Sequence, residues 1–257
     1  MLSNLYAEER LEKIVTLVES QQRVSVPELE RYFKVSGATI RADLRKLENE
    51  NRILRTHGGA IPYQKKIFED LPASRKNEAS KVKIAKKAIE YIENKDTILL
   101  DTGTTCWALA QEISSRGFTD LTVVTHDLKI AMILEIVPHI EVILIGGKIR
   151  KNFSYTHGSQ VIQSISDYSV DKGFIATSAF SIENGFSTPN IETAAIKKSM
   201  ILASKEVFML TDSSKYGLDS FKKFASFKDI ECLIINQGIP EPVITKLKSK
   251  GLTIIIV

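Results

Sequence analysis

Residues 24–62 read VSVPELERYFKVSGATIRADLRKLENENRILRTHGGAIP, and this stretch decides the fold of the N-terminal part of the chain. Two short helices separated by the turn KVSG are predicted here. Val26, Leu29 and Phe33 recur at helical spacing in the first helix. Pro27 lies in the first turn of that helix, where its missing N–H costs no hydrogen bond. Ser36 is a good N-cap for the second helix.

The second helix has one apolar and one basic face. Ile40, Leu44 and Leu47 follow one another at i, i+4 and i+7, which predicts a buried stripe. A short helix of this kind, directly after a tight turn, suits the reading of a DNA major groove. The alternative is a solvated helix in some other small bundle. The outward face carries Ala38, Arg41, Ala42, Arg45 and Lys46, and the acidic Asp43, Glu48 and Glu50 are expected to lie among them.

Residues 52–62, RILRTHGGAIP, favour a β-hairpin wing after the second helix. Apolar and polar residues alternate there, and Gly58-Gly59 supplies the turn. Arg52, Arg55 and His57 would lie along this wing, beside the groove. Residues 4–20 predict a first amphipathic helix, and VSV at 24–26 predicts a short strand before the second. Contacts to double-stranded DNA are expected from Ser36, Ala38, Thr39, Arg41, Ala42, Arg45, Lys46, Arg55 and His57.

The pattern VSxxTIRxDLxxLExxxxxxRTHGGA in this stretch resembles the N-terminal domain of the DeoR family of bacterial transcription regulators. The resemblance implies a winged helix-turn-helix domain that binds duplex DNA. One position departs from the pattern: the family usually has two arginines before the aspartate, and here the second is Ala42. The matching residues are Val35, Ser36, Thr39, Ile40, Arg41, Asp43, Leu44, Leu47, Glu48, Arg55, Thr56, His57, Gly58, Gly59 and Ala60.

Composition narrows the remaining choices. The chain has 257 residues, enough for two domains or one large one. Its net charge of +4 is mild, but basic residues outnumber acidic ones between Arg41 and Lys66. Two distant cysteines, Cys106 and Cys232, exclude a disulfide framework and a cysteine-based metal site. No leader and no bilayer-length apolar run are seen, so a cytoplasmic protein without membrane contact is expected.

Short apolar runs recur in the second half of the chain, with helical stretches between them. Strands that are apolar on both faces and alternate with helices indicate a parallel sheet covered on both sides. The predicted fold is α/β: a winged helix-turn-helix domain at 1–62, a linker at 63–78 and a parallel-sheet effector domain at 79–257. The runs cover 97–102, 121–126, 141–147, 172–178, 206–212, 231–237 and 252–257, and the helices lie near 79–93, 104–116, 127–137, 159–168, 190–204 and 240–250.

Ligands of such sheets bind beyond the carboxyl ends of the strands. The Gly-Thr-Thr turn after the first strand would present N–H groups to an anion at a helix start. Simpler interpretations remain for each residue: Thr104 caps its helix, the glycines form a turn, His126 bonds to backbone, and the lysines are solvated. The expected cleft for an anion and a polyol consists of Asp101, Gly103, Thr104, Thr105, His126, Gly146, Gly147, Lys148, Asp212 and Lys215.

Blocks of this half also resemble DeoR-type effector domains: DTGTTCWALA, VVTHDLKIA, VILIGGKIRKN, DKGFIATSAFSIENGFSTPNIETAAIKKSMI and LTDSSKYG. The resemblance implies a fold similar to that of ribose-5-phosphate isomerase, a phosphorylated sugar as effector, and no cofactor. A homo-oligomer, either dimer or tetramer, is expected because two reading helices would have to be held at operator half-site spacing. Two departures lie near the cleft, because the family usually has Asn-Ser where this chain has His126-Asp127, and Thr-Asp where it has Ile235-Asn236.

Three functions were weighed from these patterns. The first is a DNA-binding repressor of a sugar-utilisation operon whose operator binding a sugar phosphate modulates. The second is a sugar-phosphate isomerase using Asp171, Lys172 and Glu192. Residues 176–185, ATSAFSIENG, lack the glycine-rich loop of true isomerases, and a first-turn helix dipole also favours Glu192. The third, a coenzyme A transferase-like enzyme, would need a distinctive glutamate. We expect a regulator with no catalytic residue and no metal site, with Glu192 among the effector-binding candidates.

Overall fold

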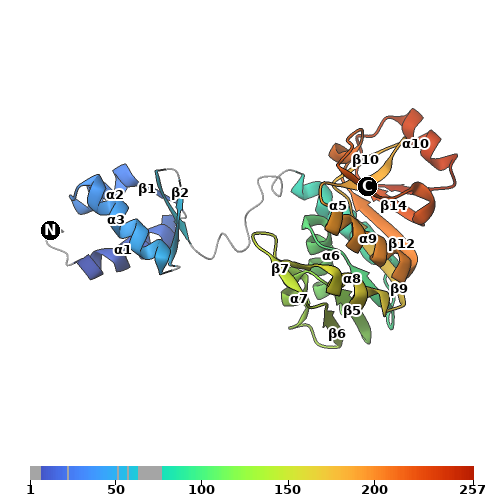
Figure 1. Cartoon of the computed structure of the whole chain (residues 1–257), viewed down its shortest axis with the longest axis horizontal. Helices are drawn as coiled ribbons and strands as arrows, with labels where there is room; N and C mark the ends of the chain where they lie inside the picture. Colours follow the sequence, from blue (N-terminus) through green and yellow to red (C-terminus); the bar gives the residue numbers. More distant parts are fainter. Residues whose placement is uncertain (1–6, 22, 51, 57, 63–76) are drawn as a thin grey trace. The chain divides into compact units, whose positions relative to one another are not determined.

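The computed structural model describes residues 7–21, 23–50, 52–56, 58–62 and 77–257. The chain divides into two compact units, Met1–Pro72 and Ala73–Val257 (Figure 1). Most of the expected linker, residues 63–76, lies outside the described residues. Each unit is therefore considered by itself.

The first unit is a winged helix-turn-helix domain, as the sequence predicts. Its helices are α1 (Ala7–Gln21), α2 (Val26–Phe33) and α3 (Gly37–Asn49). Strands β1 (Val24–Ser25), β2 (Ile53–Thr56) and β3 (Gly59–Pro62) form an antiparallel sheet in the order β1-β3-β2. The apolar stripes of the three helices meet in one core, which includes Leu11, Ile14, Val18, Leu29, Phe33, Ile40, Leu44, Leu47 and Ile53.

Local hydrogen bonds explain where α2 and α3 begin. Ser25 caps α2 in a capping box with Glu28. Lys34 ends α2 in the left-handed conformation, with φ of 55°. Ser36 then caps α3, its hydroxyl accepting from the backbone N–H of Thr39 at 3.2 Å. These caps fix the tight turn that orients α3.

The second unit is built on a seven-stranded sheet in the order β15-β14-β12-β9-β4-β5-β6, and every neighbouring pair is parallel. All seven strands match apolar runs in the sequence. Their bounds are β4 Thr97–Leu100, β5 Leu121–Thr125, β6 Ile140–Leu144, β9 Val170–Ala176, β12 Ser204–Thr211, β14 Cys232–Ile235 and β15 Thr253–Ile256.

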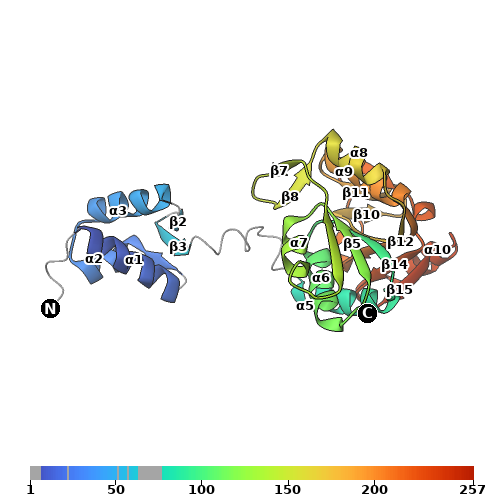
Figure 2. The same cartoon turned by 90° about the horizontal axis from the view of Figure 1, so that it is seen from below.

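Helices cover both faces of this sheet, which explains why most positions in its strands are apolar (Figure 2). Residues of α5 (Glu78–Ala88), α6 (Thr104–Arg116) and α7 (Leu128–Leu134) belong to the core on one face. Residues of α8 (Ser159–Ser166), α9 (Ile191–Ala203) and α10 (Glu241–Lys248) belong to the core on the other. Short 3-10 turns lie at η1 (Ile89–Tyr91), η2 (Ser213–Lys215) and η3 (Phe227–Asp229).

Two small β structures were not predicted from the sequence. A hairpin joins β7 (Lys148–Arg150) to β8 (Tyr155–His157). Strands β10 (Ala179–Ser181), β11 (Gly185–Thr188) and β13 (Lys222–Ala225) form a separate antiparallel sheet. The expected strand 141–147 was too long, because β6 ends at Leu144 and Lys148 begins the hairpin. The hairpin and the small antiparallel sheet both contact α9, whose first turn carries the effector candidate Glu192.

Candidate functional site

The outward face of α3 is basic, as expected. Ala38, Arg41, Ala42, Arg45 and Lys46 are all exposed, whereas Ile40, Leu44 and Leu47 are fully buried. The buried stripe holds the helix against the domain core, and the exposed face is open to a ligand. Contacts from this face to DNA remain a prediction.

Asp43 does not lie among the exposed residues, contrary to the expectation from sequence. It is only 9% exposed, and its carboxylate accepts two hydrogen bonds from the guanidinium of Arg10 on α1, at 2.7 and 3.2 Å. The same hydrogen bonding raises the pKa of Arg10. Because Asp43 faces inward and is neutralised there, it does not cancel the positive charge of the outward face.

The wing carries Arg55, which is exposed on β2 and lies 3.6 Å from the carboxylate of Glu48. Arg52 was expected beside it but instead binds Glu12 on α1 at 2.6 Å, and this hydrogen bond raises the pKa of Arg52. His57 lies outside the described residues. At Gly59, an added Cβ would come within 2.1 Å of the Val24 carbonyl oxygen, so only glycine allows β3 to pair closely with β1.

In the second unit, three predicted residues follow the carboxyl ends of sheet strands and are buried there. Asp101 follows β4, His126 follows β5 and Asp212 follows β12. Since all these strands are parallel, their carboxyl ends lie along one edge of the sheet. Buried polar side chains at this edge are the core of the candidate effector site.

Asp101 pairs with a lysine that sequence reasoning missed. Its Oδ2 accepts from the ammonium of Lys197 on α9 and from the Ala176 N–H at 2.9 Å. Lys197 also donates to the Ala176 carbonyl at 2.9 Å, and it is only 4% exposed. The other carboxylate oxygen, Oδ1, has no hydrogen-bond partner in the described parts of the chain. One signal was available in the sequence: Ala194 and Met200 lie three positions before and after Lys197, on the same side of the predicted helix.

His126 lies beside this pair and is fully buried. Its ring meets Tyr155 edge-on, with centroids 5.6 Å apart, and its Nδ1 has no hydrogen-bond partner among the described residues. The pKa of His126 is lowered to about 4, mainly by burial; Asp101 opposes this shift and Lys197 adds to it. The imidazole is therefore neutral near pH 7 and able to exchange hydrogen bonds with a hydroxyl group.

The β7–β8 hairpin brings a second cation to the same region. Arg150 donates to the Tyr155 hydroxyl at 2.5 Å and lies 3.5 Å from the hydroxyl of Thr193 on α9. Sequence reasoning did not select Arg150. Lys148, which it did select, is exposed at the start of β7. Gly146 and Gly147 are exposed in the connection between β6 and β7, which agrees with the turn interpretation.

Glu192 lies in the first turn of α9 and binds the hairpin. Its carboxylate is 2.7 Å from Nδ1 of His157 on β8. The other two isomerase candidates are not near it. Asp171 and Lys172 lie at the amino end of β9, where they bind Lys205 at 2.8 Å and Asp96 at 2.6 Å. The three candidates therefore do not form one site, and their sequence-based grouping was wrong.

The start of α6 is open to an anion. Gly103 is the N-cap residue and has no side chain with which to cap the helix, so the interpretation of Thr104 as a cap was wrong. The φ of Gly103 is +114°, which favours glycine at this position. Thr104 and Thr105 occupy the first two helical positions, with Thr105 buried. The first N–H groups of the helix thus remain available for hydrogen bonds.

Asp127, one of the departures from the family pattern, has a structural role. Its Oδ1 caps α7 by accepting from the N–H groups of Lys129 and Ile130 at 2.8 and 3.1 Å. Its Oδ2 accepts from the Thr102 hydroxyl at 2.5 Å and from the indole N–H of Trp107 at 2.8 Å. Burial raises the pKa of Asp127, against these hydrogen bonds. It joins β4, α6 and α7 near the edge.

Asp212 is also extensively hydrogen-bonded. Its Oδ1 accepts from the Asn77 amide at 2.9 Å, from the Ser214 N–H at 3.1 Å and from the Ser214 hydroxyl. Lys215 is half-buried in the following η2 turn. Lys81 on α5 is buried nearby; burial lowers its pKa, while Asp212 raises it. Asp212 thus sits among cationic groups at the same sheet edge.

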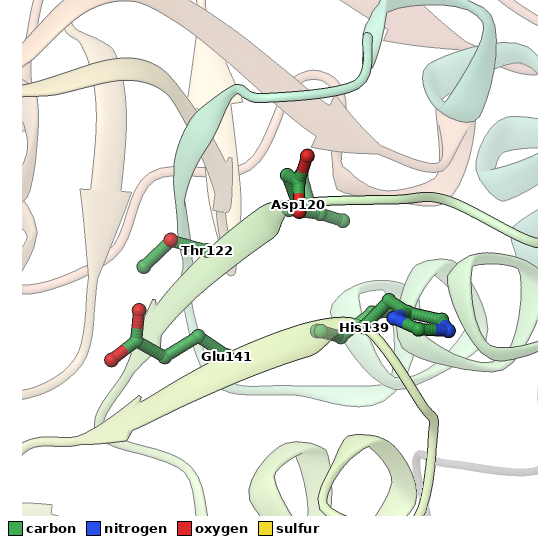
Figure 3. Close-up of a pocket in the computed structure, with 6 residues that line it drawn as sticks. Asp120, Thr122, His139 and Glu141 are labelled. Carbon is green, nitrogen blue, oxygen red and sulfur yellow. The ribbon is translucent and has the colours of Figure 1, made fainter.

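A pocket of about 440 Å³ opens at the opposite edge of the sheet, at the amino ends of β5 and β6 (Figure 3). Asp120, Thr122, His139 and Glu141 line it. Its two carboxylates repel a phosphate group, and none of the predicted effector residues lies there. This pocket is therefore not the expected effector site.

Other site types find no support in the described ranges. They contain no group of three or more His, Cys, Asp or Glu side chains arranged to hold a metal ion. None of their helices has the length and apolar character required to span a bilayer. Cys106 and Cys232 are both buried as free thiols.

Comparison with known proteins gives two family matches: the DeoR-like helix-turn-helix domain over residues 10–66 and the DeoR C-terminal sensor domain over residues 76–237. The chain is 34% identical over 235 residues to the HTH-type transcriptional repressor GlcR of Bacillus subtilis, covering 91% of this chain and 90% of that one. It is 30% identical over 237 residues to the glycerol-3-phosphate regulon repressor of Escherichia coli, covering 91% and 92%. Ribose 5-phosphate isomerase A from Methanocaldococcus jannaschii matches 55% of each chain with 18% identity and a TM-score of 0.40.

Proposed function

Since this chain belongs to the DeoR family of transcription regulators, we propose that it represses a sugar-utilisation operon and that a phosphorylated sugar modulates its binding to the operator. The proposal of an effector site rests on a cluster of buried polar side chains at the carboxyl edge of the sheet. Asp101, Lys197 and His126 meet there, with one carboxylate oxygen and one imidazole nitrogen lacking partners in the described residues. Buried polar atoms without partners are costly, and a polar ligand satisfies them.

The exposed basic face of α3 is the proposed reading surface. Arg41 and Arg45 suit guanine edges or phosphates, and Ser36 and Thr39 at the helix start suit the phosphate backbone. Two copies of α3, one helical turn of DNA (about 34 Å) apart, would read the halves of an operator. A dimer or tetramer is therefore the proposed assembly, acting on DNA in the cytoplasm.

The sensor domain offers separate groups for the two parts of a sugar phosphate. Open N–H groups at Gly103 and Thr104 suit the phosphate, with positive charge from Lys148 and Arg150. Asp101 and His126 suit sugar hydroxyls. The name of the Escherichia coli relative, a glycerol-3-phosphate regulon repressor, supports a phosphorylated polyol as the class of effector.

The same geometry favours a sensor without isomerase activity. Proton transfer between two sugar carbons needs a base and an acid within reach of one substrate. Asp171 and Lys172 lie at the amino end of β9, and Glu192 is bound to His157. Turnover of ribose 5-phosphate by the purified protein would contradict this part of the proposal.

A thermal-shift screen tests the effector class. Sugar phosphates, the matching unphosphorylated sugars and inorganic phosphate are each titrated against the full chain. A ligand bound only by the native state adds stability as RT ln(1 + [L]/Kd), about 2.7 kcal/mol at one hundred times Kd. The proposal expects a concentration-dependent rise in Tm for at least one sugar phosphate and not for its unphosphorylated sugar. Equal rises in Tm for a sugar phosphate and its unphosphorylated sugar would show that the protein does not recognise the phosphate group.

A further inference from the structure

Asn77, the first described residue after the segment 63–76, is bound to the effector edge of the sheet. Its amide donates to Oδ1 of Asp212 at 2.9 Å, across 135 positions of sequence. Asn77 has a left-handed φ of 65° and directly precedes α5. Its carbonyl accepts from the Lys81 N–H at 3.1 Å, which ties Asn77 to the first turn of α5. The entry of the chain into the sensor domain is thus held by a residue of the candidate site.

Oδ1 of Asp212 has no lone pair left for a further hydrogen bond. It receives the Asn77 amide, the Ser214 N–H and the Ser214 hydroxyl, whereas one carboxylate oxygen offers about two lone-pair sites. A ligand hydroxyl that donates to this oxygen must therefore displace a donor. Ser214 contributes two donors from the adjoining η2 turn, so the single bond from Asn77 is the one that breaks at least cost.

The surroundings of Asp212 favour such an exchange. Asp212 is only 3% exposed, and Lys81 and Lys215 lie close to each other near it. Lys81 is on the same first turn of α5 as Asn77, so one short segment carries both an amide and a cation that respond to Asp212. A change in the hydrogen bonding of Asp212 therefore acts on the start of α5.

We propose that the Asn77–Asp212 hydrogen bond couples effector binding to the segment that leads back to the DNA-reading unit. A sugar hydroxyl that donates to Oδ1 of Asp212 replaces the Asn77 amide there and frees the first described residue of the sensor domain. This inference rests on the proposed function, and it adds the route by which one site influences the other.

Replacing Asn77 by glycine tests the link, because glycine accommodates the positive φ and lacks the side chain that carries the amide. Asn77→Asp is the second variant, which keeps the side-chain shape but sets a carboxylate against Asp212. The matched control is Asn184→Gly. It removes an equivalent amide-to-carboxylate bond, from Asn184 to Asp219 at 2.8 Å, in the small antiparallel sheet region.

Operator affinity is measured on a duplex that the parent protein selects from a random library. Each protein is titrated with and without glucose 6-phosphate, fructose 1-phosphate, ribose 5-phosphate and glycerol 3-phosphate. The parent and Asn184→Gly are expected to change operator affinity by about 5- to 150-fold with an active sugar phosphate. Both Asn77 variants are expected to change it less than about twofold, while their sugar-phosphate Kd stays within about threefold of the parent value.

Three results would overturn the link. The first is an Asn77 variant that responds to the sugar phosphate as strongly as the parent. The second is loss of sugar-phosphate binding itself, because Asn77 would then be a binding residue. The third is a parent that responds to none of the compounds, which contradicts the proposed function and this inference together. A responsive parent with a fully responsive Asn77→Gly contradicts the inference alone.

Discussion

Lys197 on α9 donates a hydrogen bond to Asp101 at the end of β4, and the two residues are 96 positions apart in the sequence. Both side chains are almost completely buried. This pair joins the carboxyl end of β4 to helix α9. It is the buried ion pair of the candidate effector site.

Breaking this pair should destabilise the sensor domain. Lys197→Met leaves the Asp101 carboxylate buried without its cation, and such a loss typically costs about 3–5 kcal/mol. Adding Asp101→Asn to that variant should restore part of the loss, because neither partner is then charged. Urea unfolding of the three proteins measures the effect. A cost below about 1 kcal/mol for Lys197→Met would show that the pair is not buried as described.

His126 should make stability fall as the solution becomes acidic. Its pKa is about 4 in the folded protein and near its ordinary value of 6.5 when unfolded. The unfolded chain therefore binds the proton more readily between these values, so the stability due to neutral His126 is complete above pH 6.5 and is lost as pH falls toward 4. We expect a loss of roughly 2 kcal/mol between pH 7.5 and pH 5.

The matched measurement uses His126→Gln. Urea unfolding at pH 7.5 and pH 5 gives the change in the free energy of unfolding with pH for the parent and for the variant. The carboxylates contribute to both changes, so the difference between them is the contribution of the His126 imidazole. The variant should lack that part of the pH dependence. An identical pH dependence in both proteins would mean that His126 titrates normally in the folded state.

Arg41→Ala should weaken operator binding without affecting the sensor domain. If Arg41 reads a base edge, the free energy of operator binding weakens by about 1–3 kcal/mol. If it contacts only phosphate, the slope of log affinity against log salt concentration decreases in magnitude by about one. Fluorescence anisotropy at two salt concentrations distinguishes these outcomes. Arg116→Ala is the control, because Arg116 is also exposed but lies at the end of α6 in the second unit. Operator binding by Arg41→Ala equal to that of the control would remove α3 as the reading helix.

Lys148→Ala and Thr104→Ala should weaken sugar-phosphate binding and leave effector-free operator binding unchanged. Lys148→Ala removes a cation proposed to bind the phosphate, and Thr104→Ala removes the hydroxyl beside the open N–H groups at the start of α6. A charge-assisted hydrogen bond contributes about 1.5–3 kcal/mol. The fluorescence of Trp107, the single tryptophan of the chain, offers a local readout because its indole binds Asp127 beside the edge. Lys246→Ala on α10 is the control. An unchanged Kd for the sugar phosphate in both variants would mean that neither Lys148 nor Thr104 binds its phosphate.

The central sheet was predictable because its strands are covered on both faces. Runs such as ILL in β4 and CLII in β14 are apolar at successive positions, and a parallel sheet covered by helices on both faces buries such runs. Asp101, His126 and Asp212 were predicted as site residues because they follow the carboxyl ends of β4, β5 and β12, and all three are buried there. Strand periodicity alone could not reveal β7, β8 and β10, which have three residues each and rely on their neighbours for burial.

The partners of the site residues were not predictable from local patterns. Lys197 and Arg150 become site residues only because α9 and the hairpin fold over the sheet edge. In the first unit, helical spacing places Asp43 beside Ile40 and Leu47, but the pattern does not reveal Arg10 on α1 as its partner. Contacts between residues so far apart in sequence depend on tertiary packing, which helical spacing does not encode.

The most direct test of the account is the operator affinity of the full parent chain, measured by anisotropy with and without each sugar phosphate of the panel. The account predicts salt-sensitive binding to the selected duplex and a change in affinity of about 5- to 150-fold with at least one sugar phosphate, but not with its unphosphorylated sugar. Salt-sensitive binding that no sugar phosphate changes would contradict the proposed link between sensing and DNA binding.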